Sequence, residues 1–244
     1  MLLHAGVADR RMWDPIRPAL TAEHDVIRLD LRGFGESTTR PRGELSHVDD
    51  ALDTLQELEV EQCHLVGASM GAGVAVEVAL TRPAAVASLL LSAPGGSLIA
   101  ELTPQLGEFI QAERAAISRG DLDAATEANL DWWLDGPHRG SESVDPALRE
   151  AVRGMQRRAF EITADWDDVA ESELDPPPFE LLSEIAVPTT VLVGGLDLDA
   201  IRDTAALVST RVRSARRVDW PDVAHLPSME RPTDFADLVL HGLQ

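Results

Sequence analysis

Residues 65–73 read LVGASMGAG and place a serine among small residues, where an apolar run gives way to a helical pattern that continues until Pro83. A sharp turn from strand to helix needs glycine two positions before and after the serine, because side chains at Gly67 and Gly71 would collide with neighbouring backbone. The pattern predicts a nucleophile elbow that exposes Ser69 beside the positive end of a helix. The alternative is a glycine-rich turn whose serine only caps the helix.

Two later segments supply an acid and a base in the order that follows such an elbow, acid first and histidine second. Residues 190–193, TVLV, predict a buried parallel strand, and Asp197 lies in the loop beyond its carboxyl end. Residues 217–220 predict a last short strand, and His225 lies between it and a terminal helix that opens near Pro232. Such a histidine can accept the proton of the serine, while an acid on its other ring nitrogen fixes the tautomer.

Five segments, spread from one end of the chain to the other, carry a resemblance to a known family: residues 2–6 (LLHAG), 29–37 (LDLRGFGES), 65–73, 193–197 (VGGLD) and 223–232 (VAHLPSMERP). With them the chain resembles the α/β-hydrolase superfamily, and within it the capped group of 3-oxoadipate enol-lactonases, pimeloyl-ester-type carboxylesterases and cofactor-free haloperoxidases or perhydrolases. Taken jointly the motifs are highly specific for the fold and the triad, but weakly specific for the substrate, because this fold hosts many chemistries. The resemblance implies an α/β fold with a mostly parallel, doubly wound sheet and an inserted helical cap.

The resemblance also implies the roles of the three catalytic candidates. Ser69 attacks the substrate, His225 moves protons, and the acid stands at a Gly-x-x-Asp position, which the stretch from Gly194 to Asp197 fits. Asp199 is a competing acid two residues further on. We expect Asp199 to cap the helix that follows instead.

Acyl transfer also needs hydrogen-bond donors for the developing oxyanion, and two backbone amides usually provide them. The N–H of Met70 is one of them. The resemblance points to the N–H of Gly6 as the second, with Val7 as the alternative, because the family's glycine before that position is alanine here. We expect His4 to brace this loop and Phe34 to lie near the mouth of the substrate pocket.

The chain changes character from about Gly96 to Pro178, where it predicts several amphipathic helices broken at glycines and prolines such as Gly120 and Gly136. This is the position in which the resemblance implies a cap over the active site. The expected organisation is a core in two parts, residues 1–95 and 181–244, with residues 96–180 forming the cap.

Aromatic side chains in the cap are candidates for an apolar wall of the substrate pocket. We expect Trp132 and Trp133 to contact substrate, although packing of the cap's own core is an equally good reason for either tryptophan.

Composition favours one globular α/β enzyme and excludes several other classes. The 244 residues suit a single domain with an insertion, and the net charge of -21 argues against a nucleic-acid partner and disfavours highly anionic substrates. All 21 basic residues are arginines, which excludes lysine Schiff-base chemistry. Metal-ligand clusters and dinucleotide fingerprints are absent from the sequence, so we expect no cofactor.

The same features set an expectation for location and assembly. The single cysteine, Cys63, allows no internal disulfide, no apolar run is long enough to span a membrane, and Met1 to His4 lack a signal-peptide pattern, so we expect a cytoplasmic protein. The family's two antiparallel N-terminal strands have no counterpart here, which would uncover the edge of a strand around Asp25 to Leu31. A misassigned start, a natural truncation and a homodimer that covers this edge are the alternatives.

The sequence therefore predicts a serine hydrolase that cleaves a small carboxylic ester or lactone through an acyl-enzyme. A carbon-carbon bond hydrolase or perhydrolase with the same triad is the enzymatic alternative. A non-catalytic binding protein on the same fold is the alternative from another class.

Overall fold

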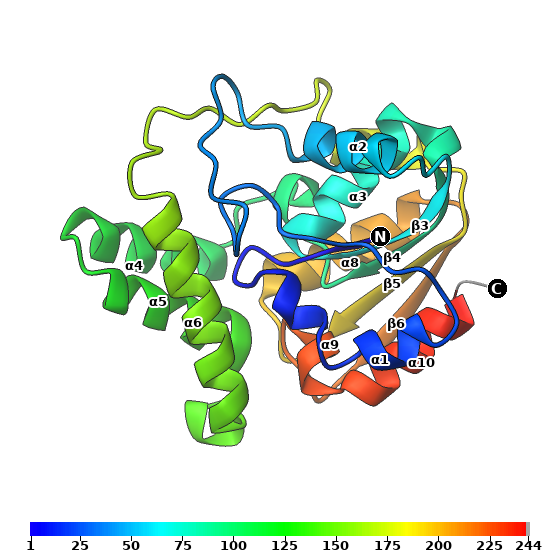
Figure 1. Cartoon of the computed structure of the whole chain (residues 1–244). Coiled ribbons are helices and arrows are strands. Elements are labelled where there is room, and N and C mark those ends of the chain that lie inside the picture. The colour runs from blue at the N-terminus through cyan, green and yellow to red at the C-terminus, as the bar shows by residue number, and fades with distance from the viewer. Residues whose placement is uncertain (243–244) are drawn as a thin grey trace.

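A sheet of six parallel strands forms the centre of the computed structural model, which describes residues 1–242 (Figure 1). The strand order is β2-β1-β3-β4-β5-β6, and every pairing between neighbours is parallel. The predicted α/β architecture is confirmed. The strands are β1 (Leu2–Leu3), β2 (Arg28–Leu29), β3 (Cys63–Ala68), β4 (Val86–Ser92), β5 (Thr189–Gly194) and β6 (Ala215–Trp220).

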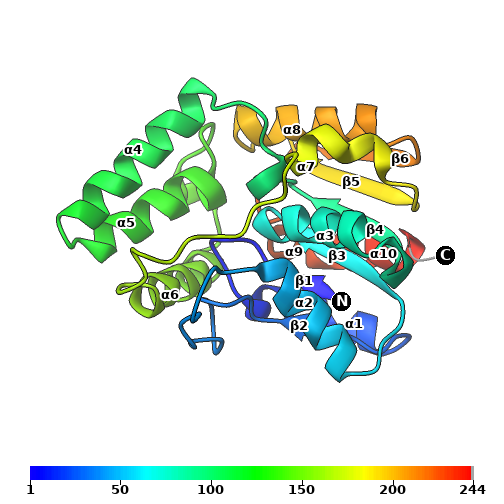
Figure 2. The ribbon, with the colours of Figure 1, turned by 90° about the horizontal axis from the view of Figure 1, so that it is seen from above.

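Helices cover both faces of the sheet, because connections between parallel strands run back along its faces and shield strands that are apolar on both sides. Strand β5, TTVLVG, is buried at every residue. Figures 1 and 2 show α2, α3 and α8 on one face and α1 and α10 on the other. The core helices are α1 (Arg17–Thr21), α2 (His47–Glu57), α3 (Met70–Thr81), α7 (Pro178–Leu181), α8 (Asp199–Arg211), α9 (Pro227–Glu230) and α10 (Pro232–Gly242).

The direction of winding reverses between β1 and β3, which are neighbours in the sheet although β2 lies between them in sequence. Leu3 pairs with Gly67, so the turn after β1 and the elbow after β3 begin side by side. Open α/β sheets bind ligands at such a switch point, outside the carboxyl ends of the strands. The pairing of Gly194 with Trp220 brings the loops after β5 and β6 together in the same way. The topology therefore brings the segments with the candidate site residues together at the carboxyl ends of the strands.

Between β4 and β5 the chain forms a helical layer beyond the carboxyl ends of the strands (Figures 1 and 2). Two of the predicted breaks are confirmed: Gly120 and Gly136 follow helical segments with φ of 69° and 78°, the left-handed region that glycine tolerates. The division into residues 1–95, 96–180 and 181–244 stays our proposal for the domains. The elements of this layer are α4 (Pro104–Ser118), α5 (Leu122–Asn129), the π-helical turn η4 (Leu130–Asp135) and α6 (Pro146–Ile162).

The helices end earlier than the sequence pattern predicted. Residues 163–177 form turns and irregular backbone instead of a helix, and this segment, the strap, docks on the core through a bridge between Leu45 and Glu171. Leu45 donates its N–H to Ala170 O and accepts from Ser172 N, both at 2.8 Å. The reason is local, since this acidic and proline-rich segment lacks the apolar period that would bury one face of a helix.

Strand β2 lies at one edge of the sheet and, within residues 1–242, pairs only with β1. It is two residues long, Arg28–Leu29, and so shorter than the stretch Asp25 to Leu31 in which we expected a strand. A short edge strand presents few unpaired backbone groups to another chain. The homodimer stays a prediction.

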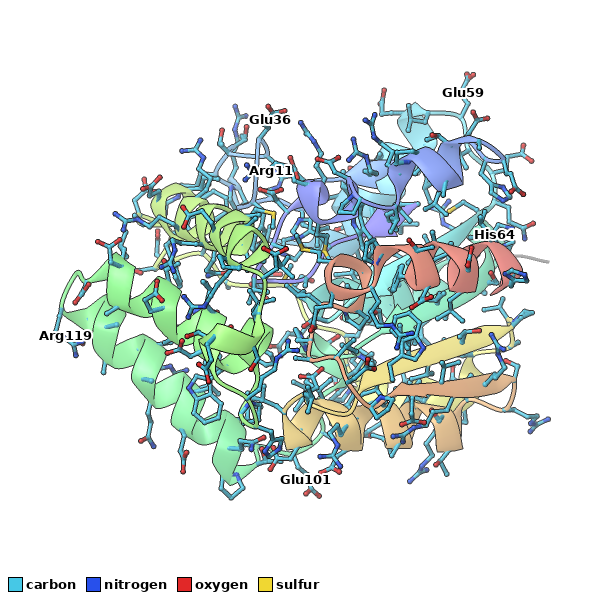
Figure 3. All side chains as sticks on the ribbon, turned by 90° about the horizontal axis from the view of Figure 1, so that it is seen from below. Arg11, Glu36, Glu59, His64, Glu101 and Arg119 are labelled. Atoms are coloured by element: carbon cyan, nitrogen blue, oxygen red, sulfur yellow. The ribbon has the colours of Figure 1, made fainter. Side chains whose placement is uncertain are left out.

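Charged side chains occupy the outer surfaces of both layers. Figure 3 shows Arg119 at the outer end of the cap and Glu59 at the end of the core farthest from it. Arg11 and Glu36 lie between these ends, where a polar cavity of about 610 Å³ separates the core from α6. The cap therefore meets the core partly through charged groups.

The packing of α3 on β1 makes Gly71 the most demanding position of the elbow. A Cβ at Gly71 would lie 2.3 Å from Leu3 O and 2.6 Å from His4 O. We expect Gly71→Ala to destabilise the protein by about 3 kcal/mol or to prevent folding, because backbone has to move. The matched control is Gly154→Ala in α6, where an added Cβ would meet no neighbouring segment within 4 Å. This substitution should raise the free energy of unfolding by about 0.5–1 kcal/mol. Urea unfolding measures both, and equal stabilities would contradict the packing argument.

Candidate active site

Ser69 lies on a strained turn between β3 and α3. Its φ of 52° and ψ of -115° are unusual for a residue with a side chain, and such strain persists only where the surroundings enforce it. Its N–H donates to Ser92 O at 2.9 Å, and Gly95 N donates to Ser69 O at 3.2 Å. The predicted need for glycine is confirmed, since a Cβ at Gly67 would lie 2.3 Å from Gly71 O. The segment has the geometry of an elbow.

His225 and Asp197 are in direct contact on adjacent loops. His225 Nδ1 lies 2.8 Å from Asp197 Oδ2 and 3.1 Å from Oδ1. Both side chains are almost fully buried, at 1% and 0% exposed. Because a carboxylate only accepts, this contact selects the tautomer of the neutral imidazole that carries its proton on Nδ1 and a lone pair on Nε2. This is the tautomer that a general base acting through Nε2 requires.

The loop that carries Asp197 is itself fixed by the sequence around it. Asp197 Oδ1 accepts the N–H of Leu198 at 2.8 Å. A Cβ at Gly194 would lie 2.3 Å from Ala224 O, so glycine lets the two loops approach closely. The close approach accounts for the contact between Asp197 and His225.

The third predicted partner is held separately. Within residues 1–242 no hydrogen bond joins Ser69 Oγ to His225, and Ser69 is half-buried beside Gly95, whose added Cβ would lie 3.2 Å from Oγ. Hydrogen bonds of a catalytic pair often tighten only when substrate binds. The structure thus joins the acid to the base, and the role of Ser69 as the nucleophile remains a proposal.

The two amides predicted for an oxyanion hole are neighbours at the switch point. A Cβ on Gly6 would lie 3.8 Å from both Cβ and Sδ of Met70. In the described part of the chain, neither Gly6 N–H nor Met70 N–H donates to a protein acceptor. The N–H of Val7, the alternative, has no acceptor there either. The choice between Gly6 and Val7 stays open.

His4 braces the turn after β1, as predicted. Its Nε2 accepts the N–H of Leu31 at 2.9 Å, and its Nδ1 donates to Ala5 O at 2.9 Å. Burial lowers the pKa of His4, which keeps the ring neutral for these two contacts. The ring of Phe34 packs edge-on against His4 with 4.9 Å between centroids.

Asp199 differs from the sequence prediction in detail. It is the first residue of α8, and the cap position belongs to Leu198, which makes no side-chain hydrogen bond there. Asp199 Oδ1 instead accepts from Thr103 Oγ1 at 2.6 Å and from Ala200 N at 2.7 Å. The expected cap is therefore wrong by one position, because the carboxylate ties the helix start to the segment before α4.

The two predicted tryptophans differ in their surroundings. The Trp133 ring packs on the imidazole of His225 with 4.5 Å between centroids, and Phe109 packs edge-on against it at 5.0 Å. Trp132 is half-buried and packs against the hydrophobic core. The structure brings Trp133 to His225, and substrate contact by either tryptophan remains a proposal.

Two cavities lie beside the elbow and share Met70 as a wall. One, of about 340 Å³, is lined by Phe34, His47 and Trp166, and the other, of about 430 Å³, extends along α3 to Glu77. Burial lowers the pKa of His47 to about 4, so this side chain is neutral near pH 7. Both cavities therefore border Met70, the residue after Ser69, and their walls are a mixture of apolar and acidic side chains.

Sequence reasoning missed a pair of residues that contacts the histidine loop. Glu230 accepts the N–H of Ala224 at 2.9 Å and pairs with Arg139 of the cap at 2.5 Å. The motif that contains Glu230 was visible in the sequence, but Arg139 lies 91 positions away and no local pattern connects the two.

Within residues 1–242 no group of three or more His, Cys, Asp or Glu side chains could hold a metal ion. None of the helices described there combines the length and the apolarity that a membrane crossing requires.

Comparisons with known proteins agree with this geometry. The pimeloyl-[acyl-carrier protein] methyl ester esterase of Aeromonas hydrophila is 26% identical over 99% of this chain and 93% of its own length. The 3-oxoadipate enol-lactonase 1 of Acinetobacter baylyi is 22% identical over 94% of this chain and 82% of its own. The crystal structure of a hydrolase from Pseudomonas aeruginosa PA01 superposes with a TM-score of 0.77 at 27% identity, covering 99% of this chain and 88% of that one. A model of the alpha/beta hydrolase family matches residues 1–238, and the chain belongs to that family.

Proposed function

We propose that this protein is a serine hydrolase that cleaves a small carboxylic ester or lactone through an acyl-enzyme. The contact between His225 Nδ1 and Asp197 is the observation that carries the proposal. It orients an imidazole whose Nε2 can accept a proton, in a loop at the same end of the sheet as the strained Ser69. The relatives named as esterases and lactonases support the ester bond as the target.

The proposed reaction begins at the hydroxyl of Ser69. His225 Nε2 takes the proton as Oγ attacks the substrate carbonyl, and Asp197 stabilises the imidazolium that forms. The N–H groups of Met70 and Gly6 donate to the oxyanion of the tetrahedral intermediate. His225 then protonates the leaving alcohol, which for a lactone is the other end of the same molecule.

Hydrolysis of the acyl-enzyme repeats the sequence with water as the nucleophile. His225 deprotonates the water, the second tetrahedral intermediate uses the same two amides, and collapse returns the proton to Ser69. Release of the carboxylic acid product leaves Ser69 protonated, the imidazole of His225 neutral and Asp197 ionised, ready for the next substrate.

The cavity walls support an uncharged substrate near the ester bond. Glu77, Glu171 and Glu173 all line the larger cavity beside Met70. An anionic group on the substrate would meet these carboxylates. The one basic side chain that lines this cavity, His47, is neutral near pH 7 because burial lowers its pKa to about 4. We therefore place neutral esters and lactones ahead of anionic ones.

Trapping of the acyl-enzyme tests the proposal. The protein is mixed with p-nitrophenyl acetate and quenched in acid, and its peptides are analysed by mass spectrometry. An acetyl group on the peptide with Ser69, absent from Ser69→Ala, supports the proposal. Ester hydrolysis that leaves no acetyl group on that peptide under single-turnover conditions contradicts it.

Acyl-chain selectivity gives a further prediction, in which Phe34 and Trp133 act differently. Phe34→Ala removes a wall of the cavity beside Met70, so kcat/KM should fall about 10-fold or more for p-nitrophenyl octanoate but little for the acetate. Trp133→Ala should lower kcat for acetate, butyrate and octanoate alike, because this ring packs on His225. Thermal melting controls for folding. A chain-length effect from Trp133→Ala but none from Phe34→Ala would reverse the two assignments.

A further inference from the structure

The loop that carries His225 is anchored by a buried carboxylate. Glu230, at the end of α9, is 8% exposed and accepts the N–H of Ala224, the residue directly before His225. Burial raises the pKa of Glu230, while the guanidinium of Arg139 opposes that shift. Nothing in the proposed reaction uses this carboxylate.

Arg139 connects the same carboxylate to the cap. Its guanidinium is 14% exposed, pairs with Glu230, and also donates to Asp135 O at 2.7 Å and to Leu134 O at 2.8 Å. These two carbonyls belong to the last residues of the π-helical turn η4. Single π-helical turns inserted in α-helices are frequent at functional sites.

The η4 turn contacts both catalytic loops directly. Trp133 O accepts the N–H of His225 at 3.3 Å, and the Trp133 ring packs on the imidazole. A Cβ at Gly136 would lie 2.5 Å from Leu196 O and 3.3 Å from Ala224 Cβ. Gly136, the residue directly after η4, thus lies close to both residues that precede Asp197 and His225 in the sequence.

We propose that Arg139 and Glu230 are positioning residues that hold the imidazole of His225 in place relative to Asp197 and Ser69. This inference rests on the proposed function. Glu230 fixes the loop through Ala224, and Arg139 holds the end of η4 against that loop. The cap thereby takes part in the catalytic geometry in addition to covering the site. A displacement of about 1 Å in such a group is enough to cost 100-fold in rate.

The opposite charges of Arg139 and Glu230 predict shifts in the pH profile of the reaction, which a purely structural role would not produce. Asp197, in the loop after β5, contacts the imidazole of His225 directly, whereas Glu230 binds the N–H of the preceding residue, Ala224. Arg139 of the cap is paired with Glu230. Glu230→Gln keeps an acceptor for Ala224 but leaves the Arg139 cation without its partner, which disfavours the imidazolium. Arg139→Gln leaves the anion, which favours it. The double variant removes both charges.

The experiment measures kcat, KM and the pH dependence of kcat/KM for p-nitrophenyl acetate with the two single variants and the double variant. We expect each single variant to lose about 10- to 100-fold in kcat with little change in KM. The acid limb of the profile should move to lower pH by about 0.5 unit in Glu230→Gln, to higher pH in Arg139→Gln, and back toward wild type in the double variant. Arg217→Gln, which breaks the exposed pair with Asp219 on β6, is the control and should change none of these.

The outcomes separate this inference from the proposed function. Lower kcat with limbs moved in opposite directions supports the positioning role. Unchanged kcat and profiles overturn it, and so does a loss of activity that follows lower melting temperatures with no movement of the acid limb. If wild-type protein forms no acyl-enzyme on Ser69, the proposed function fails instead.

Discussion

Ser69→Ala and His225→Ala will each lower kcat for p-nitrophenyl acetate by about 10³-fold or more, and the double variant will lose no more than either single one. Nucleophile and base act as a unit, so removing one already abolishes the contribution of the other. Residual activity over water is expected from the amides of Met70 and Gly6. Steady-state kinetics of the three variants, with circular dichroism to check folding, is the measurement.

Additive losses in this series would contradict the pairing of Ser69 with His225. The comparison matters because the structure holds no hydrogen bond between these two side chains, so kinetics has to establish their cooperation. Gly154→Ala, on the exposed side of α6, is a suitable control for handling and expression and should keep full activity.

Asp197→Asn should cost about 10³- to 10⁴-fold in kcat, whereas Asp199→Asn should cost less than about 3-fold. The amide at position 197 donates as well as accepts, so the imidazole can present the wrong tautomer to Ser69. Asp199 accepts hydrogen bonds from Thr103 and Ala200, and within residues 1–242 none joins it to His225. The same ester assay measures both variants. A severe loss in Asp199→Asn with a mild one in Asp197→Asn would move the acid to Asp199.

The sequence could predict those parts of the site that short motifs encode. Gly67 and Gly71 predict the elbow because only glycine fits where the added Cβ would meet backbone. Asp197 and His225 each follow a recognisable strand, and parallel topology then brings the two loops together. The fold class follows from the same strands, since near-continuous apolar runs such as β5 are typical of a buried parallel sheet.

Other features depend on contacts between distant segments and have no local signal. The strap of residues 163–177 is held by a bridge to Leu45, which no periodicity within the strap predicts. The position of Trp133 against His225 depends on how the π-helical turn η4 ends at Gly136. The pair of Arg139 and Glu230, 91 positions apart in the sequence, joins the cap to the loop that carries His225. Sequence patterns thus predicted the residues of the proposed triad, and tertiary packing decided what supports them.

The central claim is that Ser69 is an activated nucleophile, and labelling with a fluorophosphonate probe tests it most directly. The probe reacts with serine hydroxyls that a neighbouring base deprotonates. We expect one label per chain, mapped by peptide mass spectrometry to the peptide with Ser69, and lost in both Ser69→Ala and His225→Ala. A label on a different residue, or undiminished labelling of His225→Ala, would contradict the account.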